Sequence, residues 1–335
     1  MRSRSDDIRD RWEKIREKAD VYISMLSGNI RYISSPTLQD PPLNAVVVSE
    51  REVVGFASIM EEDRSRELTY VEDVRAFSAS LPSYSKSLKS GLREYLRSLG
   101  KGEIVSDRGL DLRPIKVNKK SIVEDLRRVK SAEEIRRIKK SIAIARSVGE
   151  KLVDLSSKTQ SELALSVEIN YELMKEAHGL PFRTIVASGK NSKYPHHSPT
   201  SRKLEGAVVC DFGAFYDGYC SDLTRTFFIG NEKEREKFEE IYDIVVKSQK
   251  SAINEIREGV RCGELDSAAR GIIEMEGYGD RFLHSTGHGL GLEVHEDPAI
   301  TPKSDERLNK NEVITIEPGI YLSEFGIRIE DDFIV

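Results

Sequence analysis

The sequence is poor in the features that mark secreted and membrane-spanning proteins. Its three cysteines, Cys210, Cys220 and Cys262, are too few for a disulfide framework and suit a reducing compartment. No apolar stretch is long enough to cross a bilayer, and the first seven residues lead into charge instead of the apolar segment of a signal peptide. We therefore expect a cytoplasmic protein that has no membrane partner.

Long runs of one charge are also missing. The net charge of −5 results from 52 Lys and Arg residues and 57 Asp and Glu residues, which are interleaved along the chain. A nucleic-acid-binding surface needs a basic patch, so we expect no nucleic-acid partner. What is present, 38% hydrophobic and 33% charged residues over 335 positions, is typical of a globular chain with a proper core and suits two domains.

Histidine is scarce and concentrated. The chain has six histidines, none before residue 178, and three of them, His284, His288 and His295, fall within the segment 282–296. The four-residue spacing of His284 and His288 raises the possibility of a zinc-protease helix, but that motif needs Glu after the first His, and Ser285 stands there. Three glycines in the same segment would each cost a helix about 1 kcal/mol. We therefore predict a loop that runs into a strand over residues 290–295, with the glycines allowing close backbone approach.

The first 125 residues predict a small α/β domain. A charged amphipathic helix over residues 5–20 is followed by apolar strand-like runs at 21–25, 45–48 and 53–58. This region has no histidine and no cysteine, so we expect a structural or capping domain. The domains are then 1–125 and 126–335.

The remaining residues show two similar rounds of helices followed by strands. Capping boxes at Ser131–Glu134 and Thr159–Glu162 predict two helix starts, and Gly179 is a candidate end of the second helix. Further helices are expected over 233–257 and 264–276, each round being followed by strands. The layout suggests a fold of two related halves, although we detect no sequence identity between them.

Four acids stand at strand positions in these halves. Asp217-Gly218 between two apolar runs predicts a two-residue hairpin turn, which places Asp211 opposite Thr224 and puts Asp211 and Asp222 on one face. In the second half, Glu317 and Glu330 each end an apolar strand, where a bare charge is costly to bury. A pair of metal ions could lie between such acids, whereas a solvated hairpin face would explain Asp211 and Asp222 without any metal. Four carboxylates and one imidazole suit a hard, oxygen-rich dinuclear site.

These residues together resemble the pita-bread metallopeptidases, in particular the branch of aminopeptidase P and prolidase, the Xaa-Pro dipeptidase. The similarity runs from about residue 126 to the end and weakly through the smaller domain, which resembles the creatinase-like domain of the family. It implies an α/β protein with an N-terminal capping and dimerisation domain and a pita-bread α+β catalytic domain with pseudo-twofold halves. In relatives the smaller domain also builds a dimer, so we expect a homodimer. The implied metal ligands are Asp211, Asp222, His288, Glu317 and Glu330.

The resemblance also implies the chemistry. Two divalent ions, Mn, Co or Zn, would activate a bridging water that attacks the peptide carbonyl before proline. Asp211 would bind one ion, Asp222 and Glu330 would bridge both, and His288 with Glu317 would complete the second. Glu317 would also accept a proton. The other implied catalytic residues contact the substrate or the tetrahedral intermediate: His196 (or its neighbour His197), His284, His295 and Arg328.

Several alternatives stay open from the sequence alone. Aminopeptidase P would act on longer Xaa-Pro peptides, and methionine aminopeptidase usually lacks the N-terminal domain and a residue like His284. A non-catalytic protein-binding module and a metal-free creatinase-type enzyme share the scaffold, but five filled ligand positions argue against both. His178 is interpreted as a helix cap, and Cys210 and Cys220 as packing residues. The sequence ends at Val335, five residues after Glu330, whereas relatives in the family continue further. This difference predicts either a short last strand or a longer natural chain.

Overall fold

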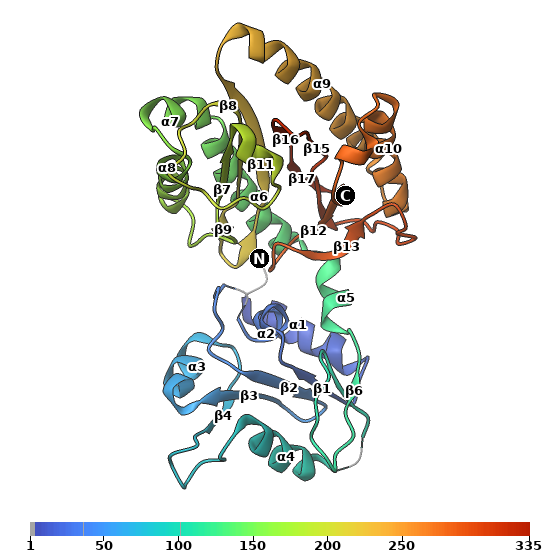
Figure 1. Cartoon of the computed structure of the whole chain (residues 1–335). Helices are drawn as coiled ribbons and strands as arrows, with labels where there is room; N and C mark the ends of the chain where they lie inside the picture. Colours follow the sequence, from blue (N-terminus) through green and yellow to red (C-terminus); the bar gives the residue numbers. More distant parts are fainter. Residues whose placement is uncertain (1–3, 36, 101) are drawn as a thin grey trace. The chain divides into compact units, whose positions relative to one another are not determined.

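The structure is a computed structural model that describes residues 4–35, 37–100 and 102–335. The chain forms two compact units, Met1–Arg127 and Arg128–Val335, whose elements are coloured blue to teal and green to red in Figure 1. The division lies two residues beyond the end of the expected first domain at residue 125. The capping and dimerisation role of that domain stays a prediction.

The N-terminal unit is built on one mixed six-stranded sheet in the order β4-β3-β2-β1-β5-β6 (Figure 1). The apolar runs at 45–48 and 53–57 are buried, and α1 and α2 contact β2 while α4 contacts β3. The bounds of the elements are α1 (Arg4–Arg16), β1 (Val21–Ser24), α2 (Ser27–Ser34), β2 (Ala45–Ser49), β3 (Val53–Ser58), η1 (Ile59–Glu61), α3 (Glu62–Leu68), β4 (Asp73–Phe77), α4 (Leu88–Leu99), β5 (Ile104–Ser106), β6 (Asn118–Lys119) and α5 (Val123–Arg128).

The first half of the C-terminal unit packs three helices against a three-stranded sheet in the order β11-β8-β7. The capping box at Ser131 and Glu134 is confirmed, since each side chain bonds the other residue's backbone N–H at the start of α6. The apolar face of α6 buries Ile144, Ala145 and Val148 in the core of this half. The bounds are α6 (Ala132–Gly149), α7 (Leu152–Lys158), α8 (Glu162–Met174), β7 (Ile185–Ser188), η2 (Gly189–Lys193), β8 (Gly206–Phe212), β9 (Phe215–Tyr216), β10 (Tyr219–Cys220) and β11 (Leu223–Ile229).

The second half repeats the layout with two helices and two further sheets. One sheet has the order β13-β12-β14-β17, and β15 pairs with β16. Helices α9 and α10 pack against each other and against these strands, at the upper right of Figure 1. The order of elements confirms the two expected rounds of helices followed by strands. The bounds are α9 (Glu232–Glu255), α10 (Cys262–Met275), η3 (Gly279–Arg281), β12 (Gly287–Gly289), β13 (Glu296–Ile300), β14 (Val313–Ile316), β15 (Gly319–Tyr321), β16 (Gly326–Arg328) and β17 (Asp331–Ile334).

The hairpin of the first half has the register that its turn predicts. Asp217 and Gly218 have φ angles of 47° and 95°, as a tight turn of this type requires. Tyr219 lies opposite Tyr216, and further along the hairpin Thr224 lies opposite Asp211. The two-residue turn therefore sets the position of the acids several residues away.

The predicted strand over residues 290–295 is wrong. That segment is an irregular connection between β12 and β13, which pair with a register shift after His288. Its hydrogen bonds explain the difference, because Leu290 N–H donates to Val313 O and Gly291 O accepts from Cys220 N–H, so the segment has no continuous partner strand. The predicted close approach is confirmed: a Cβ at Gly287 would overlap the carbonyl oxygen of Thr315.

The start and the end of α8 also differ from the expectation. Ser161, not Thr159, caps the helix by accepting a hydrogen bond from Ala164 N–H. The helix ends at Met174, five residues before Gly179, so His178 is not its cap. His178 Nδ1 instead accepts a hydrogen bond from Asp217 N–H at 3.2 Å and supports the hairpin turn. Cys210 and Cys220 are buried packing residues, as expected.

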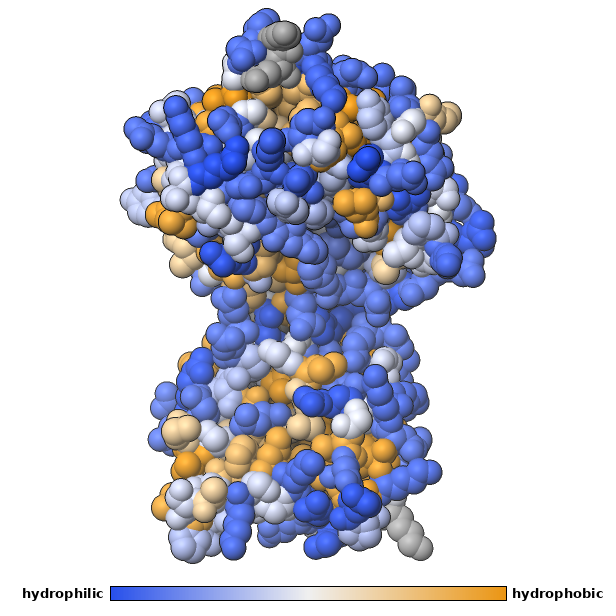
Figure 2. Space-filling model, viewed as in Figure 1, coloured by the Kyte–Doolittle hydropathy of each residue, from blue (hydrophilic) through white to orange (hydrophobic). Residues whose placement is uncertain are grey.

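Among the described residues, no helix is both long enough and apolar enough to pass through a membrane. The face in Figure 2 is mostly hydrophilic, with hydrophobic residues interspersed on both units.

Candidate metal centre and active site

One cavity of about 520 Å³ in the C-terminal unit collects the predicted site residues. All five predicted metal ligands line it, together with His196, His284, His295 and Arg328. The full lining is Phe182, Arg183, Ile185, Pro195, His196, Asp211, Asp222, His284, Ser285, Gly287, His288, Val294, His295, Ala299, Glu317, Arg328 and Glu330. The two halves of the unit thus contribute to a single site, as their repeated layout suggested.

Hydrogen bonds between the halves bring the acids together. Glu330 N–H donates to Thr224 O, and Thr226 Oγ1 donates to Arg328 O at 2.7 Å. These bonds align β11 with the segment that carries Glu330, so the acids of the first hairpin face those of the second half. The site therefore depends on the contact of the two sheets and not on any one segment.

Asp222, His288 and Glu330 form the centre of the cluster, where one ligand-type atom of each lies within 4.8 Å of the others. His288 Nε2 is also 3.4 Å from Glu317 Oε1. The other ring nitrogen, Nδ1, is 3.0 Å from Gly289 O and must donate to it, because a carbonyl oxygen only accepts. The lone pair of Nε2 therefore faces the acids, which is the orientation that a metal-binding imidazole needs.

Two carboxylate oxygens at the centre of the cluster are left without a hydrogen bond. Asp211 Oδ1 and Asp222 Oδ1 are buried and make no hydrogen bond with any residue that the structure describes. A buried carboxylate oxygen without a donor is costly, and such atoms in folded proteins call for a bound ion or water. Carboxylate oxygens with one imidazole are a donor set for hard divalent cations, so the residues present fit the expected metal ions.

The electrostatics of the cluster lead to the same conclusion. Burial, followed by repulsion from neighbouring acids, raises the pKa values of Asp222 and Glu330 well above their ordinary range. Burial also raises the pKa of Glu317 to about 8 and lowers the pKa of His288 to about 4. The close contacts of His288 with Asp222 and Glu317 are therefore not ion pairs of charged groups in the metal-free protein. Cations placed among these acids would favour their ionised forms.

We expect the stabilisation of the metal-free protein by added Mn²⁺ to increase with pH. The pKa of Glu317 is raised in the folded state from 4.5 to about 8, so its contribution to stability is present at low pH and is lost as pH rises between these values. A bound cation replaces the proton and removes that loss. Differential scanning calorimetry should show a larger rise in Tm on adding saturating Mn²⁺ at pH 8 than at pH 5. An equal rise in Tm at pH 5 and pH 8 would contradict this expectation. Glu317→Gln should reduce the pH dependence of Tm in the metal-free protein.

Arg328 is committed to the structure of the site. Its Nη2 lies 2.6 Å from Asp211 Oδ2, its Nε donates to Thr224 Oγ1 at 3.1 Å and its Nη1 donates to Tyr321 OH at 2.9 Å. The side chain is only 4% exposed. Nη1 also donates to Pro195 O at 3.3 Å. Arg328 therefore orients Asp211, and four of its five N–H groups are already committed to the protein.

Tyr321 connects this arginine to His284. Its hydroxyl is 2.8 Å from His284 Nε2, and His284 Nδ1 is 2.8 Å from Ser285 O. Since Ser285 O only accepts, Nδ1 carries the proton and Nε2 accepts from the Tyr321 hydroxyl. Burial, aided by the charge of Arg328, lowers the pKa of His284 to about 4, so the ring is neutral near pH 7.

The two neighbouring histidines 196 and 197 occupy different environments. His196 is exposed and lines the cavity. His197 Nε2 instead bonds Glu162 Oε2 at 2.9 Å and does not line it. This arrangement favours His196 over His197 as the residue that faces a substrate.

Glu162 organises the loop that carries His196. Its fully buried carboxylate accepts hydrogen bonds from Ser188 N–H, Asn191 Nδ2, Thr200 N–H and Thr200 Oγ1, besides its bond to His197. Sequence analysis assigned Glu162 to a capping box, because an acid at the start of a helix usually has that role. Its partners lie up to 38 residues away in sequence, so no local pattern indicates that Glu162 holds this loop.

Asp332 and Thr315 are two further supports that the sequence did not single out. Asp332 Oδ2 accepts from Asp222 N–H at 3.0 Å, and Thr315 Oγ1 accepts from His288 N–H at 3.1 Å. Each lies two residues from a predicted ligand, Glu330 or Glu317, the spacing at which side chains of an extended segment point the same way. That alternation is the sequence signal that could have identified both residues.

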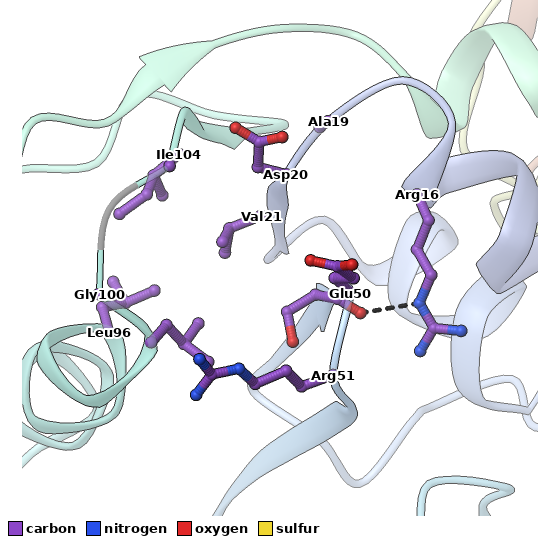
Figure 3. A pocket seen from close by; sticks show the side chains of 12 residues that line it. Arg16, Ala19, Asp20, Val21, Glu50, Arg51, Leu96, Gly100 and Ile104 are labelled. Carbon is purple, nitrogen blue, oxygen red and sulfur yellow. Dashed lines mark hydrogen bonds between the residues drawn. The ribbon is translucent and has the colours of Figure 1, made fainter.

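A separate cavity of about 470 Å³ lies in the N-terminal unit (Figure 3). Two bases, Arg16 and Arg51, and two acids, Asp20 and Glu50, lie around it, and Arg16 Nε donates to Ser49 O at 2.7 Å. The mixed charge and the absence of histidine and cysteine from this part of the sequence give no pattern of catalysis or metal binding.

Comparison with known proteins places the chain in a family. Residues 136–335 match the model of metallopeptidase family M24. The Xaa-Pro dipeptidase of Pyrococcus furiosus is 40% identical over 218 residues, which are 64% of this chain and 62% of that protein. The putative Xaa-Pro aminopeptidase of Mycoplasma genitalium is 40% identical over 216 residues, 63% of this chain and 61% of that protein. The matched part thus spans less than two thirds of the length of these relatives.

Solved structures extend the likeness to the whole chain. The recombinant prolidase of Thermococcus sibiricus superposes with a TM-score of 0.87 at 30% identity, covering 100% of this chain and 95% of that one. The chain therefore belongs to metallopeptidase family M24, whose members use divalent metal ions. It has the two-domain pita-bread fold of the prolidase structures, which confirms the predicted fold class.

Proposed function

We propose that this protein is a dinuclear-metal Xaa-Pro dipeptidase, which hydrolyses the peptide bond before proline. The observation that carries the proposal is the cluster of four acids and His288 in one cavity, where one buried oxygen each of Asp211 and Asp222 has no hydrogen-bond partner among the described residues. The names of the relatives from Pyrococcus furiosus and Thermococcus sibiricus support the dipeptidase assignment.

The proposed ligands are Asp211, Asp222, His288, Glu317 and Glu330. Two divalent ions held there would supply an activated water and would polarise the carbonyl of the scissile bond. Mn, Co or Zn would suit this donor set. The protein itself orients Asp211 through Arg328 and positions the backbone of Asp222 through Asp332. In this proposal Glu317 accepts a proton during the attack, while His196, His284 and His295 surround the substrate.

The wall of the cavity suits a proline ring. Phe182, Ile185, Pro195 and Val294 supply apolar surface beside the polar centre. A peptide bond to proline is a tertiary amide whose ring restricts the backbone, so its hydrolysis needs a pocket shaped to the ring. An apolar wall next to a hydrolytic centre is consistent with that need.

The test compares kcat/KM of the Mn²⁺-loaded protein for three substrates: Ala-Pro, the same peptide extended by two residues, and a peptide that begins with Met-Ala. We expect the dipeptide to be preferred. A preference for the extended proline peptide would assign the protein as aminopeptidase P, and a preference for the Met-led peptide would overturn the proposal.

Two further parts of the proposal concern the class of protein and its assembly. A metal assay on protein purified without chelator separates a hydrolase from a non-catalytic binding module, since the module needs no stoichiometric metal. We also propose a homodimer in which the N-terminal unit provides contacts and limits access to the site. Sedimentation equilibrium would test that assembly, and a monomer at micromolar concentration would contradict it.

A further inference from the structure

Two arginines line the cavity, and they differ in how much of their hydrogen-bonding capacity is used. Every nitrogen of Arg328 already donates to Asp211, Thr224 or Tyr321. Arg183 is exposed and makes no hydrogen bond or ion pair with any residue in the described ranges. The guanidinium of Arg183 is therefore available to bind a ligand with a negative charge.

The sheet register places Arg183 on the side of the metal cluster. Ile185, the first residue of β7, lies directly opposite Asp211 on β8. Residues opposite each other in an antiparallel pair share one face, and residues two apart along an extended segment point the same way. Arg183 precedes Ile185 by two residues, with Thr184 buried between them, so it lies on the face that Asp211 occupies.

We propose that Arg183 binds the free carboxylate of the Xaa-Pro substrate and so determines the preference for dipeptides. This assignment rests on the proposed function. Arg183, and not Arg328, is assigned this role, because Arg328 orients Asp211.

The chemistry of both partners supports the assignment. A guanidinium presents a planar fork of donors that matches a carboxylate bidentately. A dipeptide carries its carboxylate on the proline itself, next to the scissile bond. Each added residue moves the terminal carboxylate by up to about 3.5 Å along the chain and leaves a neutral carbonyl in its place. The apolar side chains of Phe182 and Ile185 line the same cavity as Arg183 and would contact the ring that bears this carboxylate.

The test measures hydrolysis of Ala-Pro and of Ala-Pro carboxamide, which differ only in the terminal charge. In Arg183→Gln we expect KM for Ala-Pro to rise roughly 10-fold or more, in line with a charge-assisted hydrogen bond at a partly exposed site. Hydrolysis of the carboxamide should change by less than about twofold, because that substrate offers no carboxylate. Arg183→Lys should restore part of the loss for Ala-Pro, since it keeps the charge without the planar fork.

Arg281→Gln is the matched control, because Arg281 is also exposed, lies in the same unit and does not line the cavity. Its KM for Ala-Pro should stay at the wild-type value. An equal effect of Arg183→Gln on the acid and the carboxamide, or an equal effect of Arg281→Gln, would overturn the assignment and leave the proposed function standing. If the wild-type protein hydrolysed neither Ala-Pro nor its carboxamide, the proposed function would be overturned, and the role of Arg183 with it.

Discussion

Replacing Asp222 by Asn is expected to abolish metal binding and hydrolysis together. Asp222 lies at the centre of the cluster, and its buried Oδ1 finds no hydrogen-bond donor in the described part of the chain. Asn keeps the size of the side chain, but it removes one negative charge and replaces one acceptor oxygen by a donor group that a cation repels. The backbone N–H of Asp222 would still donate to Asp332, so we expect the local fold to be kept.

Metal content by plasma emission spectroscopy and turnover of Ala-Pro measure the two effects. Asp217→Asn is the matched control, because it makes the same substitution at the turn of the same hairpin, outside the cavity. The control should keep about two ions per chain and wild-type turnover. Full activity in Asp222→Asn, or in protein stripped of metal, would contradict the proposed ligand set.

The sequence predicts several elements of this fold from local signals. The capping box at Ser131 and Glu134, the turn at Asp217-Gly218 and the apolar runs of β2 and β3 depend on residues a few positions apart. The turn even predicts the pairing of Asp211 with Thr224, because hairpin register follows from turn length. These features need no knowledge of the tertiary structure.

Features that depend on distant partners were mispredicted or missed. The alternating pattern of residues 290–295 resembles a strand, yet its backbone bonds go to Val313 and Cys220 instead of one neighbouring strand. Glu162 has the sequence context of a helix start, but its carboxylate holds a loop up to 38 residues away. Pattern analysis misses both cases, because the partners of these hydrogen bonds are distant in sequence.

The candidate site shows the same division. Residue type and strand position suggested Asp211, Asp222, Glu317 and Glu330 as a group, and family resemblance added the individual roles. Only the structure shows that Arg328 is committed to Asp211 and that His197 is committed to Glu162. Hydrogen-bond partners thus decide which arginine and which histidine remain available to a substrate. The sequence alone does not show these partners.

Replacing His295 by Ala is expected to lower turnover by roughly 10²–10⁴-fold while the metal content stays at about two ions per chain. His295 lines the cavity and packs edge-on against His288, with ring centroids 4.3 Å apart. Its side chain makes no hydrogen bond with any residue that the structure describes, so it can bond a substrate or a developing oxyanion. Burial lowers the pKa of His295 below its ordinary value, which leaves one N–H donor on a neutral ring near pH 7.

His284→Ala is expected to reduce turnover over the same range by a different route. Both nitrogens of His284 are bonded to the protein, and Tyr321 connects this ring to Arg328 and through it to Asp211. Its loss should therefore disturb the orientation of Tyr321 and Arg328 besides removing a side chain from the cavity wall. His178→Ala provides the matched control, since His178 lies outside the cavity and its hydrogen bond with Asp217 N–H is exposed, so that water can replace it. Turnover and metal content should both stay near wild type in that control. Loss of metal from His284→Ala or His295→Ala would mean that the variant residue is itself a ligand, and unchanged turnover would remove it from the catalytic site.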